Sequence, residues 1–189
     1  MPKYQANAIQ TLRNEHKTMR YLLDLLERQI ALIEKTAPPD YDLIREVVDY
    51  FLTFPDLCHH PKEDLILRRL QARDPDATAG VLNLEIEHKK SSERLGEFSR
   101  AVINVLLEAE ISRETFVDIA NRFIQGERAH MSAEENEFFP VALRCLSAED
   151  WAEIDGKIDR FRDPLAAIGN LRFGLLHERL SAHQHSQAS

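Results

Sequence analysis

Apolar residues recur along the chain at steps of three or four positions, which is the period of an α-helix that buries one face. Strand-like alternation is absent, and only 6 of the 189 residues are glycines. The pattern therefore predicts an all-α protein. Four long helices are expected, with apolar stripes over residues 9–33, 44–70, 81–105 and 116–141.

Residues that end or start helices lie between these stripes. Pro38-Pro39-Asp40 ends the first helix and starts the second, and Asp74-Pro75-Asp76 ends the second. Ser112 and Glu114 are start signals for the fourth helix. Such short connections favour an antiparallel up-down four-helix bundle. A shorter helix is expected around residues 151–161, as a C-terminal extension.

Length and composition set the class of protein. The length suits one domain, and we expect the bundle to span residues 1–147, followed by a C-terminal helix and polar tail over residues 148–189. The formal net charge of −8 argues against a general nucleic-acid binder. No run of about 18 apolar residues exists, so no membrane span is expected. Because the N-terminus lacks the apolar core of a signal peptide and two cysteines make no disulfide framework, we expect a cytoplasmic location.

Histidine and glutamate recur in the two halves of the chain. Each half contains a Glu-His-Lys triplet and, further on, a His-x-x-x-Glu pair that spans one helical turn. The triplets are Glu15-His16-Lys17 and Glu87-His88-Lys89, and the pairs are His59 with Glu63 and His130 with Glu134. The histidine of the pair follows the histidine of the triplet by 43 residues in the first half and by 42 in the second.

These four histidines lie on the apolar stripes, so they are expected to point into the bundle. Burying four imidazoles and two carboxylates without a metal would be costly, because unpaired buried charge destabilises a fold. The donor set His16, His59, Glu63, His88, His130 and Glu134 therefore predicts metal binding. Two non-haem iron ions suit these donors.

Taken together, the motifs resemble the hemerythrin-like HHE cation-binding domain over about residues 8–145. The residues that carry the resemblance are His16, Cys58-His59-His60-Pro61-Lys62-Glu63-Asp64, Glu87-His88 and His130-Met131-Ser132-Ala133-Glu134-Glu135. The resemblance implies a four-helix bundle that holds a di-iron centre with an oxo or hydroxo bridge. It also implies that His16 and His59 serve one half of the site, His88 and His130 serve the other, and Glu63 and Glu134 bridge the irons.

The second helix offers an alternative pair of ligands. His60 and Asp64 are displaced by one residue from His59 and Glu63. A shift of one residue rotates a side chain by about 100° around a helix, so the two pairs cannot face the same point. The alignment of the two His-x-x-x-Glu pairs favours His59, and His60 is a candidate for an additional coordination site.

Residues beside these motifs are candidates for supporting roles. Glu15 and Glu87 precede their histidines, either as hydrogen-bond acceptors or occasional ligands, or as solvated charges, which we favour. Pro55 and Pro61 remove backbone donors and are expected to bend the second helix beside the metals.

The sequence departs from the oxygen-carrying hemerythrins, which place a second histidine one turn away on the third helix. Leu84 and Ser92 occupy those positions around His88. Four imidazoles would leave coordination open, which favours reactivity over reversible oxygen carriage.

We therefore predict a di-iron protein that reacts with or binds oxygen, peroxide or nitric oxide, in the setting of oxidative stress. The alternatives are a sensing or binding module for oxygen or nitric oxide without turnover, and an iron donor for the repair of iron–sulfur centres.

Overall fold

The computed structural model describes residues 5–79, 83–107, 111–158, 160–161, 176 and 179. These residues form helices and no strand, so the prediction of an all-α protein is confirmed. None of the helices in this part of the chain is long and apolar enough to cross a membrane.

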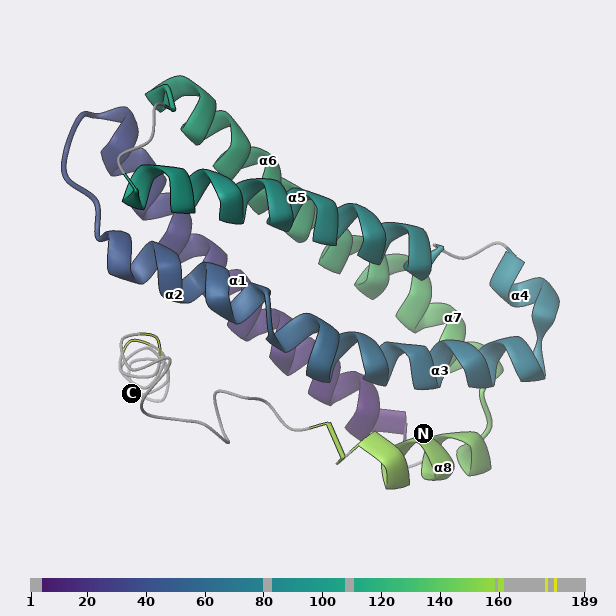
Figure 1. Cartoon of the computed structure of the whole chain (residues 1–189). Helices are drawn as coiled ribbons and strands as arrows, with labels where there is room; N and C mark the ends of the chain where they lie inside the picture. The colour runs from purple at the N-terminus through teal and green to yellow at the C-terminus, as the bar shows by residue number, and fades with distance from the viewer. Residues whose placement is uncertain are drawn as a thin grey trace.

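The long helices lie along one axis of the molecule (Figure 1). They are α1 (Gln5–Glu34), α2 (Tyr41–Phe51) followed by α3 (His60–Arg73), α5 (Leu84–Leu106), and α6 (Arg113–Ala133) followed by α7 (Phe139–Cys145). Helix α6 packs against α1 and α5, α2 packs against the same two helices, and α3 packs against α7. Two further α-helices are α4 (Pro75–Ala79) and α8 (Ala148–Ile158), and α8 packs against α1 and α3.

Capping side chains set the helix starts. Asp40 accepts a hydrogen bond from the backbone N–H of Leu43 at 2.9 Å, and Ser112 accepts one from Thr115 at 3.1 Å, so both predicted starts are found. Asn83 caps α5 through the N–H of Ile86 at 3.2 Å. Helix α5 therefore begins at Leu84, and Val81, where the apolar stripe begins, lies outside the described residues.

The second and fourth expected helices each contain a π turn. These turns are η1 (Pro55–His59) and η2 (Glu134–Phe138). The N–H of His60 donates to the carbonyl of Pro55, and the N–H of Phe139 donates to the carbonyl of Glu134. Because Pro61 and Pro140 follow directly, each lacking an N–H and crowding the carbonyl four residues back, the wider turn accommodates the proline ring.

The core consists of two apolar clusters that lie on either side of the predicted ligands. The larger cluster includes Met19, Phe51, Leu95 and Phe123, and the smaller includes Leu12, Ile66, Leu84, Phe138 and Trp151. His88 lies between Leu84 and Leu95 on α5, and His130 lies between Phe123 and Phe138 on α6 and its continuation. The candidate ligands therefore form a polar layer between two clusters of buried apolar side chains.

Part of the expected C-terminal tail packs against the long helices. Leu176 is fully buried in the larger cluster, and its N–H donates to Glu46 at 3.1 Å. Tyr21 donates to the carbonyl of Arg179 at 3.2 Å. The domain boundary after residue 147 stays a prediction.

Candidate metal centre

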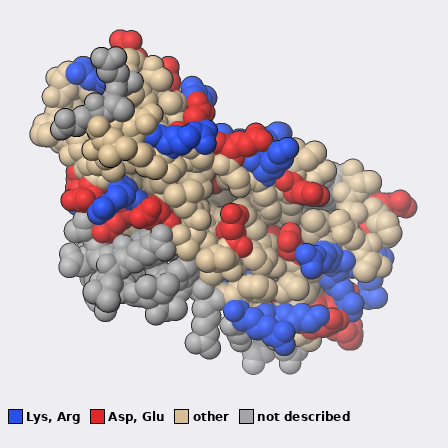
Figure 2. Space-filling view, in the orientation of Figure 1, with Lys and Arg blue, Asp and Glu red and all other residues tan. Residues whose placement is uncertain are grey.

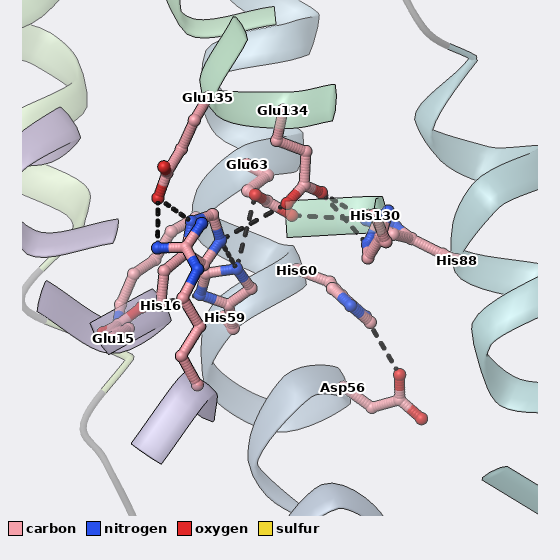
Figure 3. A network of polar contacts seen from close by, with 12 residues as sticks. Glu15, His16, Asp56, His59, His60, Glu63, His88, His130, Glu134 and Glu135 are labelled. Atoms are coloured by element: carbon pink, nitrogen blue, oxygen red, sulfur yellow. Dashed lines mark hydrogen bonds and ion pairs between the residues drawn. The ribbon is translucent and has the colours of Figure 1, made fainter. Parts of the chain in front are cut away.

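Seven of the described histidine and glutamate side chains converge in two groups (Figure 3). The first group contains His16, His59, Glu63 and Glu134, and the second contains His60, His88 and His130. In each group one ligand atom from every residue lies within 4.8 Å of the others. Helix α1, the η1–α3 junction, α5 and α6 with η2 all contribute to the centre.

Glu63 and Glu134 connect the two groups. Glu63 places Oε1 3.4 Å from His59 Nε2 and Oε2 3.2 Å from His88 Nε2. Glu134 places Oε2 3.3 Å from His16 Nε2 and Oε1 3.1 Å from His130 Nε2. Each carboxylate therefore presents one oxygen to either group, which is the geometry needed to bridge two metal ions.

The buried donors fit a metal better than they fit one another. None of the four oxygens of Glu63 and Glu134 has a hydrogen bond of good geometry from the described residues, and both side chains are fully buried. Buried carboxylates normally have such partners. Hard oxygen donors and imidazole nitrogens that surround one space suit iron, manganese or zinc.

The two groups differ in their exposure. In the first group all four residues are buried, whereas the side chains of His60 and His88 in the second group are 12% and 15% exposed. The first group is therefore shielded from solvent, and the second group is partly accessible to it.

The structure places His59 and His60 in different groups, so they do not exclude each other. They are the last residue of η1 and the first of α3, where their side chains diverge as the rotation between adjacent helical residues requires. Together with His60, the described residues bring five imidazoles to the centre. The expected count of four histidines leaves out this contribution from the second helix.

A family comparison agrees with the motifs and the geometry. The model of the Hemerythrin HHE cation binding domain matches residues 7–142. The chain belongs to this family. The family assigned from the motifs is therefore confirmed, and cation binding is the property that the description of this family names. Comparisons with curated proteins and with solved structures found no match.

Carboxylates touch the outer nitrogen of three histidines in this HHE domain. Nδ1 of His16 lies 2.9 Å from Glu135, Nδ1 of His59 lies 2.9 Å from Glu15, and Nδ1 of His60 lies 3.1 Å from Asp56. A carboxylate on Nδ1 fixes the tautomer and leaves Nε2 as the donor toward a metal. Glu15 thus has a contact in the centre, although a solvated charge was the favoured prediction.

Two other candidates point elsewhere. Asp64 lies 3.7 Å from Arg68, with its side chain 45% exposed, and is in neither group. Glu87 accepts a hydrogen bond from Lys90 at 2.7 Å.

Protonation balances the charges of the centre when it holds no metal. Burial by itself lowers the pKa of His59, but the charge of Glu63 and the hydrogen bond to Glu15 outweigh it and raise the pKa to about 10. Burial also opposes protonation of His88, yet its contacts with Glu134 and Glu63 raise the pKa to about 9. The pKa values of Glu63 and Glu134 are lowered despite burial, because histidines surround them. Protons on His59 and His88 thus offset two carboxylates that a metal would otherwise neutralise.

A buried acid lies one helical turn from the centre. Glu127 precedes His130 by three residues, and Ser91 follows His88 by three. Ser91 donates to Glu127 at 2.6 Å, and burial raises the pKa of this carboxyl. Sequence reasoning missed this pair, although its spacing from the two histidines places it on the same helix faces.

Proposed function

We propose that this HHE domain is a non-haem di-iron protein with a redox or binding role toward oxygen, peroxide or nitric oxide. The observation that carries the proposal is the pair of fully buried glutamates, each of which presents one oxygen to either histidine group. In the proposed centre, His16 and His59 would hold one iron, His60, His88 and His130 would hold the other, and Glu63 and Glu134 would contribute an oxygen to each. When bound, a pair of irons supplies one-electron redox chemistry and coordination positions for a small molecule.

The donor counts differ between the two positions. The first position receives two imidazoles and one oxygen from each glutamate, whereas the second receives three imidazoles and the other two oxygens. Open coordination therefore belongs mainly to the first position. With five imidazoles, open coordination would lie mainly on one side of the centre, instead of extending equally to both irons as the sequence suggested.

Burial limits the size of the ligand. His16, Glu63 and Glu134 are 0% exposed and His59 is 1% exposed. A molecule of two or three atoms suits such a position better than a large organic substrate, whose surface would need a cleft.

The remaining features of the proposal follow from the arrangement and charge of the chain. We take the long helices as the antiparallel up-down four-helix bundle of the family, and a cytoplasmic location as the setting. Acidic and basic side chains lie side by side on the face shown in Figure 2, which supports a role without nucleic acid or membrane as partner.

The reactivity of the reduced protein tests this proposal. Iron-loaded protein, reduced without oxygen, would be mixed in a stopped-flow instrument with oxygen, hydrogen peroxide or nitric oxide. We expect at least one of them to change the optical spectrum rapidly, and zinc-loaded protein, which cannot change oxidation state, to give no response. Iron-loaded protein that responds to none of the three would contradict the proposal.

Iron donation is a second candidate function, which the partial exposure of His60 and His88 favours. A metal behind these two side chains can be reached by a chelator or an acceptor protein. Transfer of iron to an apo iron–sulfur protein, faster than release to buffer alone, would support this role over the redox role.

A further inference from the structure

The two imidazoles of the buried first group, His16 and His59, each contact a carboxylate that in turn contacts a positively charged side chain. Glu15 touches His59 through one oxygen and Lys62 Nζ through the other. Glu135 touches His16 at 2.9 Å, and the same oxygen accepts from Arg20 at 3.0 Å. His59 and His16 are thus each the first member of an imidazole–carboxylate–cation chain.

Lys62 is buried to a degree that is rare for lysine. It is 2% exposed, and its Nζ lies 5.9 Å from the centre of the Phe54 ring, besides its contact with Glu15. Burying an ammonium group costs free energy unless a partner compensates its charge. Since Lys62 directly precedes the bridging residue Glu63, its backbone position is fixed by the centre itself.

Among the residues that the structure describes, the second half of the chain shows no equivalent imidazole–carboxylate–cation contacts. Ala133 precedes Glu134 where Lys62 precedes Glu63, and Glu87 binds Lys90 on the surface instead of a histidine. His130 Nδ1 is buried and has no hydrogen-bond partner among the described residues. The buried Lys62 next to the His59–Glu63 pair therefore has no counterpart next to the His130–Glu134 pair, so it does not follow from the repeated motif.

We propose that Lys62 is a positioning residue that acts through Glu15 on the electron density of the His59 imidazole. It thereby sets the reduction potential of the metal held by the first group, which contains His16 and His59. This inference rests on the proposed di-iron function. A carboxylate on Nδ1 draws the proton away from the ring and makes Nε2 a more negative donor, which stabilises ferric iron over ferrous iron. The positive charge of Lys62 partly neutralises the carboxylate of Glu15, and this weakens the effect of Glu15 on the His59 ring.

The direct charge of Lys62 acts in the same direction. A buried positive charge near the metals disfavours the oxidised, more positive state, and a low-dielectric surrounding screens it little. Arg20 should act likewise on His16 through Glu135, but less strongly, because its side chain is 35% exposed. The expected order of influence is therefore Lys62 before Arg20.

Midpoint potentials of iron-loaded variants test this inference. Lys62→Met should lower the potential relative to the wild type, because Glu15 loses its cation. Glu15→Gln should raise it, because the negative charge is removed. Lys62→Arg should restore most of the wild-type potential, and Arg20→Met should lower it by less than Lys62→Met.

A matched control separates this role from simple loss of charge or packing. Lys90→Met removes the same side chain from a Lys–Glu pair on α5, where Lys90 is 54% exposed, and should leave the potential unchanged. A purely structural Lys62 would shift the potential in the same direction in Lys62→Met and Glu15→Gln, or in neither. Either of those results would overturn the inference.

A second readout keeps this inference distinct from the proposed function. In zinc-loaded protein, nitrogen NMR of the His59 ring reports the charge on the imidazole without any redox chemistry. We expect the Nδ1 resonance to move in opposite directions in Lys62→Met and Glu15→Gln. If the wild type holds two irons but neither the resonance nor the potential responds, the inference fails and the di-iron function stands. If the zinc-loaded variants show both NMR shifts but the wild type takes up no iron, the di-iron function fails and the control of His59 by Lys62 stands.

Discussion

His60 stacks on His88, with ring centroids 3.7 Å apart and ring planes 17° apart. The stack joins the start of α3 to the first turns of α5 and brings His60 into the group with His88 and His130. Its neighbour His59 belongs to the other group. Two adjacent residues, the last of η1 and the first of α3, thus belong to two different candidate metal-binding groups.

Replacement of either residue should therefore cost one metal and not both. For His59→Ala and for His60→Ala, we expect metal content to fall from about two ions to about one per chain, because each variant loses an imidazole from a different position. Elemental analysis of the purified variants measures this. Asp64→Ala is the control and should keep the wild-type content, since Asp64 is in neither group. Full metal content in His60→Ala would place His60 outside the ligand set.

Removal of metal should destabilise the protein, and the loss should grow with pH. A chelator should lower the melting temperature by about 5–10 °C, because a ligand at about 100 times its Kd contributes roughly 2.7 kcal/mol to a native state that alone binds it.

The pH dependence follows from the raised pKa values of His59 and His88. Their stabilising protonation is fully present below the unfolded value of 6.5 and is lost as pH rises through about 9 and about 10. Metal-free protein should lose stability over this range, while metal-loaded protein, whose imidazoles are already deprotonated, should not. Thermal melts with and without chelator would show the gap widen from about pH 7 to about pH 9. A gap that narrows over this range would contradict the account of how protons replace metal.

Pro61 should be needed for the arrangement of the two adjacent histidines. In Pro61→Ala, residue 61 regains an N–H, so a regular α-helix can replace the π turn η1. The turn then holds one residue fewer than the π turn does, so the segment before it rotates by about 100° relative to α3. We expect metal affinity to fall by roughly tenfold or more, a loss comparable to that of other residues that orient ligands. Circular dichroism should show unchanged helix content.

The control for this variant is Pro75→Ala, at the first residue of α4, where no π turn is present. It should bind metal as the wild type does. Unchanged affinity in Pro61→Ala would mean that the π turn does not position the histidines.

The sequence predicted the helices because their apolar period is a local property. Asp40 and Ser112 marked helix starts for the same reason, since a cap depends on residues within one turn. The π turns could not be foreseen, because Pro61 and Pro140 predict a disturbance without specifying its form. The burial of Leu176 in the C-terminal tail could not be predicted, because it depends on contacts distant in the sequence, such as its hydrogen bond to Glu46 on α2.

The candidate ligands were identified because a metal centre requires donors at helical spacing, and the pairs His59–Glu63 and His130–Glu134 satisfy that requirement, one in each half of the chain. The contacts around them depend on packing between helices. Lys62 lay within the recognised motif, but only the approach of α1 to α3 brings it to Glu15. His60 was in doubt because helix rotation excludes a shared position with His59, and the structure removes that conflict by placing the two histidines in different groups.

Metal analysis with magnetic spectroscopy on protein purified from its own host tests the central claim most directly. The account predicts about two irons per chain, given two donor groups joined by two glutamates. In the oxidised protein, Mössbauer spectra should show a magnetically coupled pair of ferric ions. EPR spectra of the same sample should show no signal from this pair. A single isolated iron, or a different metal at full occupancy, would contradict the di-iron centre.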